Sequence, residues 1–159
     1  VMYNSAPYER ATWDPRAGQP QLSPPVANEG WGSAVAAGDF NGDGFEDIAV
    51  GAPQYLTNRG RVYVYHGAAT GLSATPTAVL YPPSGVGGYG GRMLGISDIN
   101  GDGFADLLIT AATIQQTPLK LHVHHGSPSG LALLPDYSFT GPNTVDGPEL
   151  HSADFTGDG

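Results

Sequence analysis

Two short acidic loops carry the residues whose types and spacing suggest a definite chemistry. In DFNGDGFED, which begins at Asp39, oxygen-bearing side chains occupy loop positions 1, 3, 5 and 9. Alternate positions of a curling loop point inward, and the glycine at position 6 permits a sharp turn. The carbonyl at position 7 then completes a set of hard oxygen ligands suited to Ca²⁺. The predicted ligands of this loop are Asp39, Asn41, Asp43, the carbonyl of Phe45, and Asp47.

The same arrangement recurs in DINGDGFAD, which begins 59 residues later. Its predicted ligands are Asp98, Asn100, Asp102, the carbonyl of Phe104, and Asp106. Carboxylates about 4 Å apart repel each other by roughly 1 to 4 kcal/mol per pair, which disfavours an empty preformed loop. The expected cofactor is therefore Ca²⁺. A third match, DFTGDG, contains Asp154, Thr156 and Asp158 but stops before position 9, which leaves its metal binding open.

Two other interpretations of these loops compete with the metal-site hypothesis. An EF-hand needs a bidentate glutamate at position 12 and a helix on each side, but position 12 is Val50 or Ile109 and the flanks are rich in glycine and β-branched residues. Asx-rich turns that merely cap hairpins are the simpler alternative. Two near-identical copies at one fixed spacing favour the metal sites.

The spacing of the loops reflects a repeat that covers most of the chain. At the same offset of 59 residues, Gly32 falls on Gly91 and Gly67 falls on Gly126. Proline and glycine turns divide each period into four short stretches of strand-forming residues. The predicted strands are 33–38, 47–51, 61–66 and 77–81 in the first period, and about 92–97, 106–111, 119–125 and 136–140 in the second.

Four antiparallel strands per period of this length predict an all-β fold built from β-propeller blades. The expected division is the last strands of a preceding blade at 1–24, complete blades at 25–83 and 84–142, and the start of a further blade at 143–159. A complete propeller needs more blades than this. We therefore expect a piece of a longer polypeptide, with the remaining blades supplied by that polypeptide, by a partner chain or by self-association.

Composition excludes several classes of protein and function. The chain has 159 residues with 40% hydrophobic and 13% charged residues, values typical of a globular domain, and it has no cysteine for disulfides or thiolate catalysis. No apolar run is long enough for a membrane span. The net charge is −9, but eight of the fifteen acids are aspartates of the three loops, and the other seven are nearly balanced by six basic residues. A nucleic-acid partner is not expected, since there is no basic stripe.

Other candidate chemistry is weaker than the acidic loops. The stretch GVGGYG at 85–90 fits a dinucleotide fingerprint, but it lacks the flanking helix and is better interpreted as a flexible linker between blades. His122 and His124 share a strand face with His125 opposite, and they fall on the half-buried positions of Tyr63 and Tyr65 rather than forming a clear metal site. No nucleophile motif supports a hydrolytic triad. The aromatic residues that could stack on sugars are Tyr3, Tyr8, Trp13, Tyr55, Tyr81 and Tyr89.

The repeats resemble the FG-GAP repeats of integrin α-subunit propellers and their bacterial relatives. Trp31-Gly32 stands where that family has Phe-Gly, and Gly51-Ala52-Pro53 matches its Gly-Ala-Pro. The second repeat is looser, with Gly90-Gly91 and Thr110-Ala111-Ala112 at these places. The resemblance implies that the loops bind calcium structurally, on the propeller face opposite the usual partner-binding loops.

The function expected from this resemblance is adhesion or protein recognition outside the cytoplasm. We expect a calcium-binding, non-catalytic propeller segment, extracellular or at the cell surface, with a protein or glycan ligand whose identity is open. A lectin-like or accessory module of a secreted hydrolase is the alternative. Nothing in the sequence resembles the ligand-binding insertions of integrins, so no integrin ligand is carried over.

Overall fold

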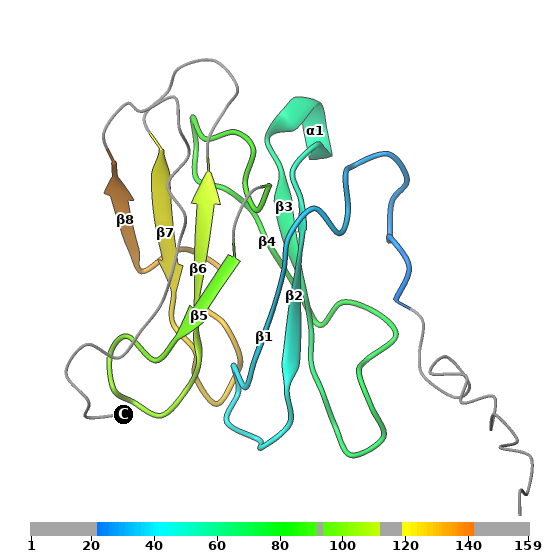
Figure 1. Ribbon diagram of the computed structural model, residues 1–159, viewed down its shortest axis with the longest axis vertical. Coiled ribbons are helices and arrows are strands. Elements are labelled where there is room, and N and C mark those ends of the chain that lie inside the picture. Colours follow the sequence, from blue (N-terminus) through cyan, green and yellow to red (C-terminus); the bar gives the residue numbers. More distant parts are fainter. Residues whose placement is uncertain (1–21, 92–93, 112–118, 142–159) are drawn as a thin grey trace, which may run out of the picture.

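The computed structural model describes residues 22–91, 94–111 and 119–141, which form two antiparallel sheets of four strands each (Figure 1). In each sheet the strands lie in sequence order, so every connection joins neighbouring antiparallel strands. The strands are β1 Val35–Gly38, β2 Asp47–Ala52, β3 Arg61–Tyr65 and β4 Ala78–Leu80, and then β5 Leu94–Ser97, β6 Asp106–Ala111, β7 Lys120–His124 and β8 Tyr137–Thr140. The predicted all-β fold of four-stranded propeller blades is confirmed.

The strands start and end within a few residues of the predicted bounds. The first strand begins two residues later than expected, at Val35, because the chain before it forms a turn in which the Ser33 N–H donates to the Gly30 carbonyl. The short helix α1 (Tyr55–Asn58) was not predicted. Its Leu56 and Thr57 have φ of 46° and 56°, so this turn is left-handed, a conformation that bulky or β-branched residues rarely adopt.

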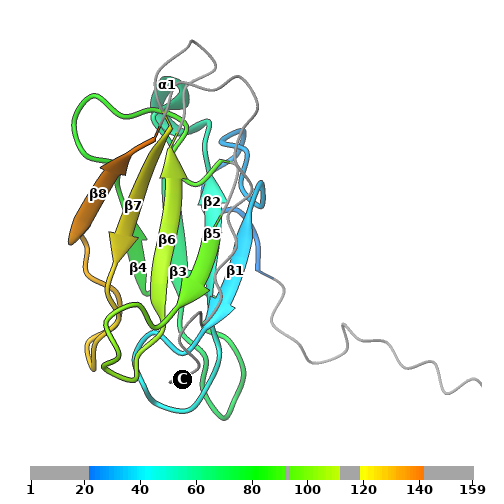
Figure 2. The same cartoon turned by 60° about the vertical axis from the view of Figure 1, so that its left-hand side comes forward.

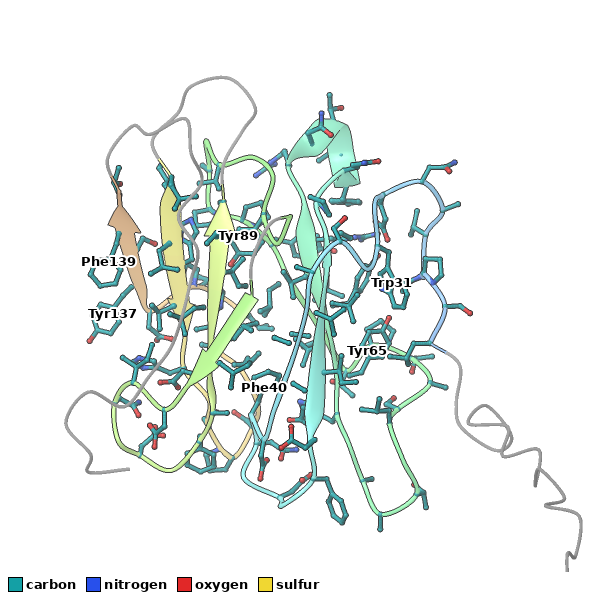
Figure 3. All side chains as sticks on the ribbon, in the orientation of Figure 1. Trp31, Phe40, Tyr65, Tyr89, Tyr137 and Phe139 are labelled. Atoms are coloured by element: carbon teal, nitrogen blue, oxygen red, sulfur yellow. The ribbon has the colours of Figure 1, made fainter. Side chains whose placement is uncertain are left out.

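The strand β3 separates two hydrophobic cores, as its alternating sequence predicts. Val62 and Val64 face the second sheet and are fully buried there, together with Leu107 and Ile109 of β6. Tyr63 and Tyr65 face the opposite way and pack with Trp31 (Figure 3). The tyrosines are buried rather than half-buried, because the chain segment before β1 covers this outer face of the first sheet.

The two sheets pack face to face. Their first strands, β1 and β5, lie side by side (Figure 2). Gly51 on β2 comes so close to the Gly90 carbonyl that a β-carbon there would overlap it. A side chain at Gly51 would therefore push the connecting segment off the first sheet.

The segment 84–91 between the sheets is part of the core, which corrects the expectation of a flexible linker. Val86 and Tyr89 are buried, and Tyr89 forms a parallel backbone bridge with Gly60 of the first sheet. Its phenol hydrogen-bonds His124 of the second sheet. Tyr89 is thus fixed to both sheets, and it has no exposed face on which a sugar could stack.

The acidic loops lie at one end of the sheets, at the β1–β2 and β5–β6 turns, and α1 lies at the other end (Figure 1). Among the described residues, no helix is both long and apolar enough to cross a membrane. The ranges expected to belong to neighbouring blades, 1–24 and 143–159, fall almost wholly outside the described residues. The blade boundaries therefore stay a prediction.

Candidate metal centre

The first acidic loop is wrapped around the carboxylate of Asp39. One oxygen, Oδ1, accepts hydrogen bonds from the backbone N–H groups of Gly42 at 2.7 Å and Asp43 at 3.1 Å. The other, Oδ2, accepts from the N–H of Gly44 at 2.8 Å. Gly42 and Gly44 have φ of 72° and 85°. These left-handed conformations let three successive N–H groups turn toward one side chain, which is why the loop needs glycine at both places.

The side chains at positions 3 and 5 of this loop meet each other. The Asn41 amide Nδ2 donates to Asp43 Oδ2 at 2.9 Å, and Asn41 Oδ1 accepts from the Asp43 N–H at 3.0 Å. Asp43 Oδ1 accepts from the N–H of Phe45 at 2.9 Å. Asp43 is exposed at the tip of the loop. The side chains of Asn41 and Asp43 are thus in contact, and the Asp43 backbone N–H is bonded to both Asn41 and Asp39.

The second loop repeats this network bond for bond. Asp98 accepts from the N–H groups of Gly101, Asp102 and Gly103 at 2.8, 3.2 and 2.9 Å. Asn100 Nδ2 donates to Asp102 Oδ2 at 2.9 Å, and Asn100 Oδ1 accepts from the Asp102 N–H at 3.0 Å. The Phe104 N–H donates to Asp102 Oδ1 at 3.0 Å. The two loops therefore share one geometry.

The position 9 carboxylates have a different environment, which the sequence did not reveal. Asp47 is fully buried and accepts from the Phe40 N–H at 3.0 Å and from the Gly67 N–H at 2.8 Å. Asp106 likewise accepts from Ile99 and Gly126 at 2.8 and 2.9 Å. Each carboxylate thus ties its loop to the turn between the third and fourth strands. The sequence does contain one sign of this contact, because the donor Gly67 recurs in the second period as Gly126.

Burial controls the protonation of Asp47. Desolvation raises its pKa above the ordinary value, while the Gly67 and Phe40 N–H groups and the neighbouring His66 lower it. A cation beside this carboxylate would lower the pKa as well, because an opposite charge favours the ionised form. The buried side of the first loop thus holds a carboxylate whose ionised form a nearby positive charge would favour.

The residues fit Ca²⁺ by donor type. All predicted side-chain ligands offer carboxylate or amide oxygens, the ligand chemistry that Ca²⁺ prefers. The loops as they stand are closed by their own hydrogen bonds. Within the described part of the chain, no three His, Cys, Asp or Glu side chains gather in a metal-holding arrangement. Ligation would require the Asn41 and Asn100 amides to turn their oxygens toward the ion. The third candidate loop, with Asp154, Thr156 and Asp158, lies outside the described residues.

The histidine pair of β7 is built into the core instead of standing open as a site. The Nδ1–H of His124 donates to the Ala132 carbonyl at 2.7 Å, so Nε2 is the nitrogen that accepts from the Tyr89 hydroxyl. His122 Nδ1 lies 2.7 Å from Ser138 Oγ. Burial lowers the pKa of both histidines. Both residues are at most 1% exposed, and their equivalents in the first repeat, the core residues Tyr63 and Tyr65, are at most 2% exposed.

Comparisons with known proteins support a family for the chain. A family model described as "FG-GAP repeat" matches residues 31–65. The chain is 39% identical over 99 residues to "Integrin alpha-7" of Homo sapiens, which is 58% of this chain and 8% of that protein. It is 36% identical over 110 residues to "Integrin alpha-3" of Cricetulus griseus, covering 66% of this chain and 10% of that protein.

A third relative is also named as an integrin α chain. The chain is 42% identical over 91 residues to "Integrin alpha-V" of Gallus gallus, covering 51% of this chain and 8% of that protein. In each comparison the match spans a tenth or less of the relative's length. The family match covers the predicted motif from Trp31 through the first acidic loop to the end of β3. By this match and these relatives together, the chain carries an FG-GAP repeat at residues 31–65 and is similar in sequence to integrin α chains.

Proposed function

We propose that the chain is a calcium-binding, non-catalytic propeller segment that serves adhesion or protein recognition at the cell surface or outside the cell. The observation that carries the proposal is the duplicated loop: two nine-residue acidic turns, 59 residues apart, have the same set of backbone and side-chain hydrogen bonds. Relatives named as integrin α chains support the recognition role.

Calcium would be held by positions 1, 3, 5, 7 and 9 of each loop. In the first loop these are Asp39, Asn41, Asp43, the Phe45 carbonyl and Asp47, and in the second Asp98, Asn100, Asp102, the Phe104 carbonyl and Asp106. When bound, the ion would supply two positive charges against the three carboxylates of each loop. Its role is architectural, since it would fix the turn that joins the first two strands of a blade.

The location follows from the same chemistry. Exposed loops of this kind are suited to weak binding, and extracellular modules bind Ca²⁺ with dissociation constants of about 10⁻⁴ to 10⁻³ M. Concentrations of calcium high enough to fill such sites occur outside the cell. The end of the sheets that carries α1, opposite the acidic loops, is then the face proposed for a protein or glycan ligand (Figure 1).

A calorimetric calcium titration of chelator-stripped protein tests the proposal. We expect about two ions per chain, with Asp43→Ala and Asp102→Ala each removing one. The matched control is Glu46→Ala, which removes an exposed acid from the first loop at a position that is alanine in the second loop. The control should keep both sites. A folded chain that takes up no calcium would overturn the proposed function.

A further inference from the structure

The two acidic loops are joined to each other through the backbone. The N–H of Ala105, at position 8 of the second loop, donates to the carbonyl of Asp39 at 3.0 Å. The N–H of Ser127, in the turn after β7, donates to the carbonyl of Phe40 at 3.1 Å. The first two residues of the first loop are therefore held by hydrogen bonds from the second blade.

Three hydrogen bonds and the short backbone segments between them link the position 9 carboxylates of the two loops. Asp106 Oδ1 accepts from the Gly126 N–H at 2.9 Å, and the next residue, Ser127, donates to the Phe40 carbonyl. The Phe40 N–H then donates to Asp47 Oδ2 at 3.0 Å. Phe40 is fully buried between the sheets (Figure 3). The two carboxylates are thus connected through the backbone of Gly126, Ser127 and Phe40.

Side-chain packing also joins the loops, but only a side chain of the second loop packs against the first. The ring of Phe104, from the second loop, lies against Gly42 of the first loop so closely that a β-carbon at Gly42 would overlap it. Gly126 is equally confined, since a β-carbon there would lie 2.5 Å from the Ala105 carbonyl and 2.9 Å from that of Phe40. Phe45, the counterpart of Phe104 in the first loop, is 41% exposed.

We propose that the second loop positions the first: Phe104, Ala105 and Ser127 hold the first loop in its cation-binding shape, so that the two loops bind cations as a coupled pair. The inference rests on the proposed calcium function. Because binding linkage is reciprocal, an ion in either loop strengthens binding in the other by the same factor. A coupling of about fivefold or more is the size expected for such a contact.

Direct repulsion between two bound cations acts against this coupling. At an ionic strength of about 0.15 M the screening length is about 8 Å, so repulsion between exposed ions is weak. The hydrogen bonds to Asp47 and Asp106 at the two ends of the backbone connection are buried, and buried interactions are screened much less. The binding measurements are therefore made at this ionic strength.

The first test compares alanine variants of the two equivalent phenylalanines by their effect on calcium affinity. Each variant is made in a protein in which an aspartate substitution leaves only one loop able to bind calcium. In Asp102→Ala protein, Phe104→Ala should weaken calcium binding to the first loop about fivefold or more, although the Phe104 carbonyl is retained. In Asp43→Ala protein, the matched variant Phe45→Ala should leave the affinity of the second loop within about twofold. Equal effects of the two variants would overturn the positioning role.

The second test needs no calcium. In chelator, amide hydrogen exchange of Gly42 and Gly44 should be faster in Phe104→Ala than in the wild type, because the support from the second loop is lost. Exchange of Gly101 and Gly103 should be unchanged in Phe45→Ala. Unchanged exchange of the first loop in Phe104→Ala would contradict the inference.

The two tests separate the inference from the proposed function. Failure of the wild-type chain to bind calcium would overturn the calcium role, while the exchange experiment would still decide whether the second loop positions the first. Two ions bound with independent affinities would leave the calcium role intact and overturn the coupling.

Discussion

At the scale of single residues, Glu29 and Arg61 bury opposite charges on the outer face of the first sheet. The Glu29 carboxylate accepts from Arg61 Nε at 3.0 Å and Nη2 at 2.6 Å, and from the Tyr63 hydroxyl at 2.6 Å. The guanidinium lies 3.7 Å from the ring centroid of Tyr55. Burial raises the pKa of the Tyr63 phenol, so this hydroxyl stays a donor. The pair holds the segment before β1 against β3.

Removing one member of this pair should destabilise the chain strongly. Arg61→Ala leaves the Glu29 carboxylate buried and unpaired, and we expect a loss of about 3 to 5 kcal/mol in the free energy of unfolding. Urea denaturation measures it. Arg59→Ala, which removes an exposed arginine two residues earlier, should change the stability by less than about 0.5 kcal/mol. A similar small change for Arg61→Ala would show that the pair contributes nothing.

His124 makes the stability of the chain sensitive to acid. Burial, helped by the nearby His122 and opposed by the Ala132 carbonyl and Asp136, lowers its pKa to about 4. Because the folded pKa lies below the unfolded value of about 6.5, the folded state favours the neutral ring. The resulting stability is complete above about pH 6.5 and is lost as the pH falls toward 4.

The expected loss from this one group is roughly 3 kcal/mol between pH 6.5 and 4, at 1.36 kcal/mol per pKa unit. Since the carboxylates also titrate in this range, the measurement is the difference in urea stability between the wild type and His124→Phe at each pH. Tyr89→Phe keeps His124 buried but removes a hydrogen bond that only the neutral ring accepts, so it should reduce the pH dependence less than His124→Phe does. An unchanged pH dependence in His124→Phe would refute this assignment.

At the scale of elements, the outer strands β4 and β8 show how packing between blades determines which side chains are buried. Leu80 on β4 and Phe139 on β8 occupy the same place in the repeat, paired with Val62 and Leu121. Leu80 is fully buried because the second sheet covers its face, whereas Phe139 is 56% exposed (Figure 3). The same position is thus core in one blade and surface in the next, within the described residues.

Truncation at these two positions should therefore have unequal effects. Leu80→Ala is expected to lower the free energy of unfolding by about 2 to 5 kcal/mol, the range for a buried leucine. Phe139→Ala should lower it by less than about 1 kcal/mol, because much of its surface is already in water. Thermal or urea unfolding of the two variants gives the comparison. An equally large loss at Phe139 would mean that another part of the protein covers this face.

At the scale of the whole molecule, calcium should act as a stabiliser. A site filled at 100 times its dissociation constant adds about 2.7 kcal/mol to the free energy of unfolding. For a chain of this size that corresponds to a rise in Tm of roughly 5 to 10 °C per site. Differential scanning calorimetry with calcium and with chelator measures it. Asp43→Ala and Asp102→Ala should each keep part of the rise, and an unchanged Tm in the wild type would contradict an architectural role.

Most of the fold could be predicted from the sequence, because its signals are local. The alternation in 61–65 assigned Val62 and Tyr63 to opposite faces, and turn residues marked the strand ends within a few positions. The left-handed turn at Leu56 and Thr57 was missed, since neither residue type favours that conformation. The Glu29–Arg61 pair was missed as well. The second period has Lys120 in place of Arg61, so the repeat offered no signal.

The sequence by itself determined the loops and the repeat, since residues a few positions apart are enough to specify a nine-residue acidic turn and a four-stranded blade. Only the tertiary structure decided what joins these units: Phe104 against Gly42, Ser127 bonded to Phe40, and Tyr89 bonded to His124. These partners are between 35 and 87 residues apart. Such contacts depend on how one sheet packs against the next, and that packing is a property of complementary surfaces that no periodic pattern encodes.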